Sequence, residues 1–348
     1  MPGAFEDLVR DYRGYDRRVD IISAFEFFFA RVPEMAATVR HFERFPRYEA
    51  ADGREVAPDF TVLFVDDTML VGELSSLARS DESLRDLTSQ IGRYDALEYG
   101  PSASRAGGGH DLAKVEDIDV LLVMPSHVSN YACDRIAAAA ADPADPYMPR
   151  RPPSILSWNL DPDDAYTFKY GNPRPRGHGR SPSLEEWLLK SADTLRGHAR
   201  HFLTIKQARR FMNDRPVAAY TATILWLEAL PQLAGGPPPI DIDTTPSDVT
   251  AWLRENLGAG DVNMVRSAFE FLQRAGLARP VAEGWRIGWR VVAASHHDLA
   301  RELVRRHLSR PTGPPTLRDR EQAEAERARG VEAEAASDQP ELAFGTEP

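Results

Sequence analysis

The sequence is poor in cysteine and in lysine, and it contains no long apolar run. Its single cysteine, Cys133, excludes a disulfide within the chain and a zinc site made of several cysteines. No segment approaches the ~18 consecutive apolar residues of a transmembrane helix. Residues 1–30 lack the basic and apolar parts of a secretory leader. We therefore expect a cytoplasmic protein that does not bind a membrane.

The charge of the chain is acidic, and its bases are almost all arginine. The 348 residues carry a formal net charge of −11, and only four of the 42 basic residues are lysine. This balance excludes a protein coated by nucleic acid over its whole surface, although it permits a local basic face. A hydrophobic fraction of 42% is enough for a packed core, and the length predicts about two domains.

Hydrophobic spacing in the first domain, residues 1–150, predicts the order α-β-β-β-α-β-α. The expected segments are a helix over 20–44 interrupted near Pro33, a strand over 46–50, strands over 59–65 and 69–75, a helix over 81–97, a loop over 100–113, a buried strand over 117–125 and a helix over 127–142. The strands on either side of Asp66 and Asp67 form a hairpin, because two β-branched runs flank a turn.

The second half of the chain predicts a mainly helical domain over 184–310, after a hairpin and linker over 151–183. The expected segments are strands over 154–159 and 165–170, helices over 184–211, 217–230, 246–256 and 262–275, a hairpin over 277–292 and a helix over 296–309. Thr245 and Asp248 form a capping signal before the helix that begins at 246. Two helices followed by strand, turn and strand resemble a winged helix. The acidic tail, residues 311–348, is expected to be disordered.

Two acidic residues in the first predicted hairpin can share a metal ion. Asp59 opens one strand and Glu73 lies late in its partner, so the antiparallel return brings both carboxylates to the same end. Together with the main-chain carbonyl of Leu74, they supply the oxygen ligands that Mg²⁺ or Mn²⁺ prefers. A metal-bound water with a lowered pKa can attack a phosphodiester. The hairpin therefore predicts a divalent-metal site.

This arrangement resembles the PD-(D/E)xK nuclease superfamily over about residues 20–142. Pro58-Asp59 matches the first motif of that family, and Glu73-Leu74 matches its (D/E)x pair. Gln90 and Tyr94 match the QxxxY helix of its exonuclease-like members. The resemblance implies an α/β, restriction-endonuclease-like fold in which the two acids are metal ligands and Gln90 and Tyr94 orient them or the DNA. It also implies a bacterial defence or DNA-maintenance setting.

The sequence departs from that family at Ser75, where the motif has a lysine. The family lysine positions the attacking water and offsets charge in the transition state, whereas a serine can hydrogen-bond a water but brings no charge. Arg79 and Arg93 can supply positive charge, but a guanidinium is a poor proton acceptor. An acid on the first helix completes the site in some members, and Glu26 or Glu43 is the candidate here. The sequence leaves open whether the site cleaves.

Each of these residues also has a purely structural interpretation. Asp59 can simply begin a strand after a proline, and Glu73 can face outward on an alternating strand. Tyr94 has the helical spacing of a core residue, which leaves Gln90 on the surface of the same helix. Glu26 lies between two phenylalanines and can mark the polar face of an amphipathic helix.

Basic residues in two segments are candidates for phosphate contacts. They are Arg200, Lys206, Arg209 and Arg210 on an expected helix over 196–215, and Arg266 and Arg286 on the second helix and wing of the winged-helix-like segment. A solvated helix face explains the first group nearly as well, and winged helices also bind protein partners. His198 and His201 have the spacing of a metal pair on a helix, but no third ligand is evident.

Two functions follow from these patterns. The first is a Mg²⁺- or Mn²⁺-dependent DNA nuclease that hydrolyses phosphodiester bonds and is positioned by an appended winged helix. The second is a pseudo-nuclease that binds DNA or a protein partner without cutting, which Ser75 and the acidic net charge favour. The joint presence of both acids with Gln90 and Tyr94 favours the nuclease. A regulatory winged-helix protein with an unrelated α/β domain is a third interpretation, and the oligomeric state is not predicted.

Overall fold

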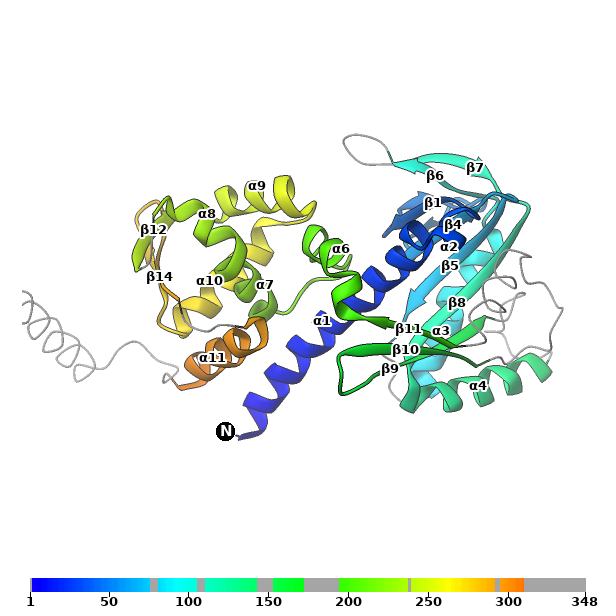
Figure 1. Cartoon of the computed structure of the whole chain (residues 1–348), viewed down its shortest axis with the longest axis horizontal. Helices are drawn as coiled ribbons and strands as arrows, with labels where there is room; N and C mark the ends of the chain where they lie inside the picture. Colours follow the sequence, from blue (N-terminus) through cyan, green and yellow to red (C-terminus); the bar gives the residue numbers. More distant parts are fainter. Residues whose placement is uncertain are drawn as a thin grey trace, which may run out of the picture.

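The computed structural model describes residues 2–75, 81–104, 110–142, 153–171, 194–236, 239–291 and 295–309. Figure 1 shows a twisted sheet with helices on one side of the molecule, and a group of helices with a small sheet on the other. The long helix α1 (Pro2–Arg31) lies between these two parts and contacts both. The protein therefore has a mixed α/β fold. Within the described residues, no helix combines the length and the apolar character needed to cross a bilayer.

The larger sheet has seven strands in the order β1-β4-β5-β8-β9-β10-β11. They are β1 (Val39–Arg44), β4 (Phe60–Phe64), β5 (Thr68–Leu74), β8 (Asp117–Pro125), β9 (Ser154–Leu160), β10 (Ala165–Gly171) and β11 (Thr194–His198). Strands β5, β8 and β9 run parallel, and the other neighbouring pairs are antiparallel. The carboxyl ends of the three parallel strands therefore meet at one edge of the sheet.

The predicted hairpin of β4 and β5 is confirmed, and it carries both candidate acids. Its turn places Asp67 at a φ of 60°, in the left-handed region that aspartate tolerates better than most residues. Gly72 pairs with Phe60 across the hairpin, and a Cβ atom at Gly72 would lie 2.1 Å from the Phe60 ring. The ring can cover β5 only because residue 72 has no side chain.

Helices cover both faces of the sheet. On one face α1 packs against the sheet and continues the larger core to the C-terminal helices; in this core Phe25 and Phe60 stack with ring centroids 5.1 Å apart. The other face is covered by α3 (Asp81–Gly92), the 3-10 turn η1 (Arg93–Ala96) and α4 (Ser126–Ala141). The predictions of helices over 81–97 and 127–142 and of a buried strand over 117–125 are confirmed.

Three segments differ from their sequence predictions. Residues 39–44, predicted as the end of a helix, form the edge strand β1 because β4 supplies their hydrogen-bond partners. Residues 100–113, predicted as a loop, contribute to a second hairpin of β6 (Tyr99–Ser104) and β7 (His110–Lys114). Residues 194–198, predicted as helix, form β11 against β10. In each case tertiary pairing decides the conformation, and the local sequence pattern does not contain that information.

The C-terminal part follows the predicted order of elements. They are α7 (Ala218–Ile224), the π-helical turn η3 (Leu225–Ala229), α8 (Leu230–Ala234), β12 (Ile240–Thr244), α9 (Pro246–Leu257), α10 (Val262–Arg274), β13 (Ala278–Val281), β14 (Gly284–Trp289) and α11 (His296–Ser309). The capping box of Thr245 and Asp248 at the start of α9 is confirmed. Strand β12 adds a third strand to the predicted hairpin, in the order β12-β14-β13.

The short remaining elements lie between these parts. They are α2 (Pro33–Ala36), β2 (Tyr48–Glu49), β3 (Glu55–Val56), the 3-10 turn η2 (Ala199–His201) and α6 (Leu203–Ala208). The larger sheet continues through residues 154–198, past the predicted boundary at residue 150, and one hydrophobic core joins it through α1 to the C-terminal helices. The domain boundaries stay a prediction, and the predicted tail, 311–348, lies outside the described residues.

Candidate functional site

Asp59 and Glu73 lie on neighbouring strands at the same end of the first hairpin, as the sequence predicts. The main-chain N–H of Asp59 donates to the carbonyl of Gly72 at 3.1 Å. Its carboxylate Oδ2 accepts a hydrogen bond from the N–H of Leu74 at 2.7 Å. Both acids are buried, with exposed fractions of 8% for Asp59 and 5% for Glu73. Neither is therefore an outward-facing surface residue.

Helix α3 and the turn η1 hold Glu73 from the second face of the sheet. The hydroxyl of Tyr94 donates a hydrogen bond to Glu73 Oε1. A side-chain hydrogen bond from Gln90 also reaches the Glu73 carboxylate. Two residues four positions apart share a helix face, which explains how both can contact one carboxylate. The structure thus brings together the four residues that the sequence singled out.

The two acids are in an environment that disfavours two negative charges. Burial raises the pKa of Asp59 to about 6, against the opposing effects of the Leu74 N–H and the Arg18 charge. Burial and the negative charge of Asp59 raise the pKa of Glu73 to about 8, although hydrogen bonds from Tyr94 and Gln90 oppose the shift. A cation between the carboxylates would relieve both effects, and two carboxylates are the hard donors that Mg²⁺ and Mn²⁺ accept.

The candidate metal site rests on two carboxylates and no more. Within the described residues, no group of three or more histidine, cysteine, aspartate or glutamate side chains is arranged to hold a metal ion. The main-chain N–H of Leu74 contacts Asp59, and the role of the Leu74 carbonyl as a third ligand stays a prediction. Magnesium sites commonly consist of one or two carboxylates and several waters, so this donor set fits such an ion.

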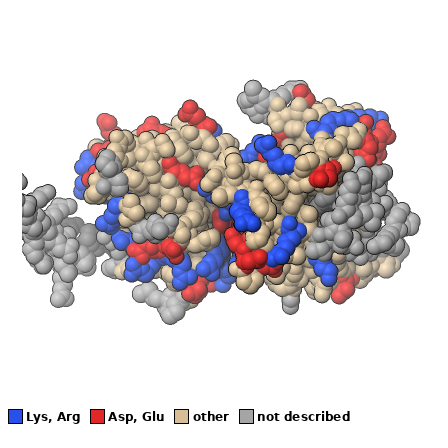
Figure 2. Space-filling model, viewed as in Figure 1, with Lys and Arg blue, Asp and Glu red and all other residues tan. Residues whose placement is uncertain are grey.

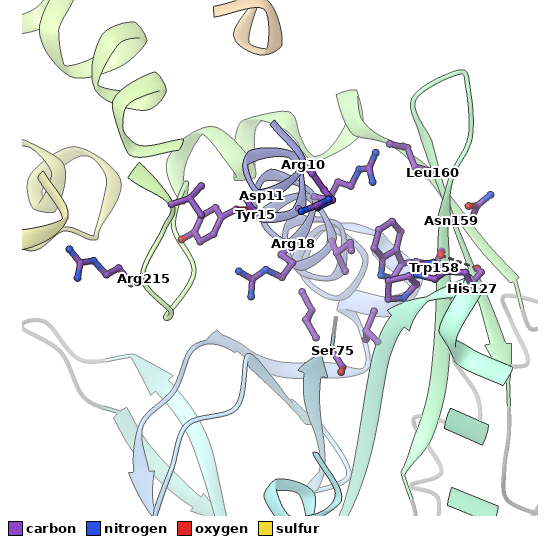
Figure 3. Close-up of a pocket in the computed structure, with 18 residues that line it drawn as sticks. Arg10, Asp11, Tyr15, Arg18, Ser75, His127, Trp158, Asn159, Leu160 and Arg215 are labelled. Atoms are coloured by element: carbon purple, nitrogen blue, oxygen red, sulfur yellow. Dashed lines mark hydrogen bonds between the residues drawn. The ribbon is translucent and has the colours of Figure 1, made fainter. Parts of the chain in front are cut away.

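A cleft of about 1130 Å³ opens beside this hairpin, at the carboxyl ends of the parallel strands. Its walls come from α1, the ends of β5, β8 and β9, and the first turn of α4. Figure 3 shows Arg10, Arg18 and Trp158 around the space, with Ser75 at its lower end. In sheets with parallel strands this edge is the usual position of a ligand site. The start of α4 adds main-chain N–H groups and a positive dipole end.

The lining of the cleft is basic, although the chain as a whole is acidic. Among the described residues that line it there are four arginines and one acid, Asp11; the arginines are Arg10, Arg17, Arg18 and Arg215. The Arg18 guanidinium lies 2.7 Å from the Asp214 carboxylate, and its positive charge opposes the rise in the pKa of Asp59. Figure 2 shows acidic and basic side chains interspersed over one view of the surface. The basic character is therefore a property of the cleft and not of that whole surface.

Sequence reasoning missed the four arginines of the cleft. Arg10, Arg17 and Arg18 belong to α1, which the sequence predicted to begin only at residue 20. Arg215 lies between α6 and α7, and its guanidinium donates to the Ser267 hydroxyl at 2.7 Å. No motif marks these residues, because only the packing of α1 across the sheet edge brings them to the cleft.

Ser75 occupies the position of the missing lysine. Its N–H donates to the carbonyl of Val123 at 2.9 Å, which continues the pairing of β5 with β8. Because side chains alternate along a strand, the side chain of Ser75 belongs to the same face of the sheet as that of Glu73. Of the two arginines that could replace the lysine charge, Arg79 lies outside the described residues and Arg93 is exposed on η1. Arg18 is the cation that the structure places beside Asp59 and Ser75.

Two of the predicted phosphate-binding residues are buried in ion pairs, which corrects that prediction. Lys206 is 8% exposed and lies 2.9 Å from Asp16 and 2.7 Å from Asp20. Arg210 is also buried, at 2.5 Å from Glu228. The segment 196–215 is not one helix, because β11, η2 and α6 divide it, so its bases do not form a stripe.

The other predicted phosphate contacts remain on the surface to different degrees. Arg200 and Arg266 are exposed, and Arg266 donates to the side chain of Asn263 at 3.2 Å. Arg286 makes two hydrogen bonds of 2.7 Å to the Asp243 carboxylate. Arg209 is about half exposed. These four residues stay candidates for nucleic-acid contact.

The two acids proposed to complete the site have other partners. Glu26 lies 2.5 Å from the Arg44 guanidinium. Glu43 is on β1 and not on the first helix; it accepts hydrogen bonds from His41 and from Ser104. Neither contacts Asp59 or Glu73 within the described residues, so the prediction that one of them completes the metal site gains no support.

The candidate site is identified from the chemistry of its own residues. No protein-family profile, no curated protein and no solved structure matches this chain. Its defining features are two buried carboxylates, the hydrogen bonds that hold Glu73, and an adjoining cleft lined by arginines. Buried acids of raised pKa beside a basic cleft are typical of a functional site.

Proposed function

We propose that this is a cytoplasmic DNA-binding protein that holds a phosphodiester backbone in the arginine-lined cleft and hydrolyses it with a divalent cation at Asp59 and Glu73. The observation that carries the proposal is the position of Glu73, which Tyr94 and Gln90 hold beside Asp59 and which directly precedes Leu74 and Ser75 in the lining of the cleft. The resemblance of these residues to the PD-(D/E)xK nucleases supports the same function.

Asp59 and Glu73 would hold the cation, and Mg²⁺ or Mn²⁺ fits their oxygen donors. When bound, such an ion lowers the pKa of a coordinated water and offsets negative charge on the phosphate. Before binding, the raised pKa of Glu73 keeps its carboxyl largely protonated at neutral pH. Tyr94 and Gln90 fix the position of this carboxyl, so little reorganisation is needed when its proton is lost.

The arginines of the cleft would bind and orient the substrate. Arg17 on α1 is exposed and can contact a phosphate, and the exposed Arg10 can do so in exchange for its ion pair of 2.7 Å with Asp7. The start of α4 offers main-chain N–H groups to the same substrate. Arg18, beside Asp59, supplies the positive charge that the missing motif lysine would bring. Ser75 can donate a hydrogen bond to a water or to a phosphate oxygen.

The direct test is DNA cleavage by the full chain with Mg²⁺, Mn²⁺ or a chelator. We expect cleavage that needs the cation and is lost in Asp59→Asn and in Glu73→Gln. Both substitutions preserve side-chain shape, so melting curves should show that each variant is folded. Unchanged cleavage in either variant would contradict the proposal, because that activity would not depend on the carboxylates.

Binding without cleavage is the second candidate, and Ser75 favours it. A site without the motif lysine lacks the charge that acts mainly in the transition state. On this interpretation the protein binds DNA in the cleft but leaves it intact with every cation. If the wild-type protein binds DNA but does not cut it with any cation, the result supports binding without cleavage.

The C-terminal part supports a winged-helix-like module that contacts DNA or a protein partner. The order of α9, α10, β13 and β14 is that of two helices and a wing, and β12 completes a small sheet. Arg266 on α10 is an exposed base of this module. Arg286 is held by Asp243 and is less free to contact phosphate.

A further inference from the structure

Trp158 forms part of one wall of the cleft, near the end of β9. Figure 3 shows its indole extending from the strand toward α1, where Arg10 and Arg18 lie. The backbone at this position is fixed, because the Ser126 hydroxyl donates to the Trp158 carbonyl at 2.9 Å and residue 158 pairs with Pro125. The ring therefore has a defined place on the wall.

Only part of the Trp158 ring is covered by the protein. One side packs against the larger core, where the ring centroid of Tyr166 is 6.1 Å away. The residue is partly exposed, and no residue within the described part of the chain accepts a hydrogen bond from its indole N–H. The lining of the cleft therefore includes a partly exposed aromatic ring whose N–H has no acceptor among the described residues.

Cations lie across the cleft from this surface. Arg10 and Arg17 are exposed on α1, and the first turn of α4 follows directly after Pro125. An aromatic ring beside fixed positive charges is the combination that binds single-stranded nucleic acid, in which bases stack on the ring while cations contact the backbone. In a duplex, neighbouring bases cover both faces of each base, so a stacking surface selects unpaired nucleotides.

We infer that Trp158 stacks an unpaired base, so that the cleft takes single-stranded DNA or a frayed end in preference to an intact duplex. This inference rests on the proposed function, because it assumes that the cleft binds a DNA backbone. It adds that the substrate is single-stranded DNA or a frayed end and that Trp158 is the residue that selects it. Cleavage is not required for it, since stacking acts on binding.

The experiment measures the affinity of the full chain for a single strand of about 12 nucleotides and for the same strand annealed to its complement, at one salt concentration and in a chelator. Wild type should bind the single strand more tightly. Trp158→Leu, which keeps an apolar side chain, should weaken single-strand binding by roughly tenfold and duplex binding far less. Trp158→Phe should remain within about threefold of wild type.

Two controls separate stacking from a folding defect. Tyr99 on β6 is an exposed aromatic residue that does not line the cleft, so Tyr99→Leu should leave both affinities unchanged. A strand that carries 2-aminopurine should lose fluorescence on binding to wild type and to Trp158→Phe, because that base is quenched when it stacks on an aromatic ring.

The outcomes separate this inference from the proposed function. Equal binding of single strand and duplex, unchanged in Trp158→Leu, would overturn the stacking role and leave DNA binding by the cleft intact. No binding of either DNA by wild type would overturn the proposed function and the inference with it. Selective loss in Trp158→Leu, retained binding in Trp158→Phe and fluorescence quenching would support both.

Discussion

The Tyr94 hydroxyl donates a hydrogen bond to the Glu73 carboxylate and thereby links the 3-10 turn η1 to the end of β5. Gln90 contacts the same carboxylate, and Asp59 lies close enough for its negative charge to raise the pKa of Glu73. A buried acid that is held in place and also disfavoured as an anion is suited to exchange a proton for a cation.

The pH dependence of stability in a chelator should report on Glu73. Its pKa is raised from 4.5 to about 8, so the folded state retains a proton that the unfolded chain has lost over this range. Stability should therefore fall as pH rises from about 4.5 to about 8, by about 1 kcal/mol or more. Glu73→Gln stays neutral and should make this slope shallower, above all between about pH 6 and 8, because Asp59, with its pKa raised to about 6, contributes below that range. Urea titrations of the two proteins at several pH values give the slope of the unfolding free energy against pH. Identical slopes would contradict the assignment of this pH dependence to Glu73.

Ser75→Lys should increase cation-dependent cleavage of DNA. A lysine ammonium at this position would offset charge that develops in the transition state, so we expect a gain of roughly tenfold to a hundredfold in rate with little change in affinity. The gain should disappear in Ser75→Lys combined with Asp59→Asn. If the wild type is active and Ser75→Lys cuts more slowly, the serine side chain itself contributes to cleavage.

Arg17→Ala should weaken DNA binding evenly across sequences. Arg17 is exposed in the cleft and makes no ion pair with another described residue, so its loss removes a phosphate contact without leaving a buried partner. The slope of log affinity against log salt should become shallower by about 1. Arg47→Ala, an exposed arginine outside the cleft lining, is the matched control. Equal effects of the two substitutions would argue against binding in the cleft.

Lys206→Met should destabilise the protein and leave the salt dependence of DNA binding unchanged. Its ammonium lies between Asp16 and Asp20, so its removal leaves two buried acids without a cation, at a cost of about 3 kcal/mol. Arg200→Ala, at an exposed position in the same segment, should change stability by less than about 0.5 kcal/mol. A stable Lys206→Met protein with a shallower salt slope would restore Lys206 as a phosphate contact.

The local parts of this structure could be predicted from the sequence. The first hairpin follows from two β-branched runs around Asp66 and Asp67, and a role of Gln90 and Tyr94 beside Glu73 is implied by the resemblance to the PD-(D/E)xK nucleases. These features depend on residues close in the sequence or on a single pairing. The candidate acids could therefore be chosen before their surroundings were known.

Burial and long-range packing could not be predicted in the same way. Lys206 and Arg200 are both bases in the same basic segment. Lys206 is buried because Asp16 and Asp20 on α1 pair with it, whereas Arg200 is exposed. Arg18 reaches Asp59 because a helix crosses the edge of the sheet. Strand β1 depends on a partner that follows it in the chain. Charge and local periodicity contain none of this information.

Calorimetric titration of Mn²⁺ into the metal-free full chain tests the central claim most directly, that Asp59 and Glu73 together bind one divalent cation. Titrations at pH 7 in two buffers of different ionisation enthalpy give both the affinity and the protons released. We predict one ion per chain and release of about one proton, because Glu73 must ionise to bind, with no binding by Asp59→Asn. Absence of binding by wild type, or equal binding by Asp59→Asn, would contradict the account.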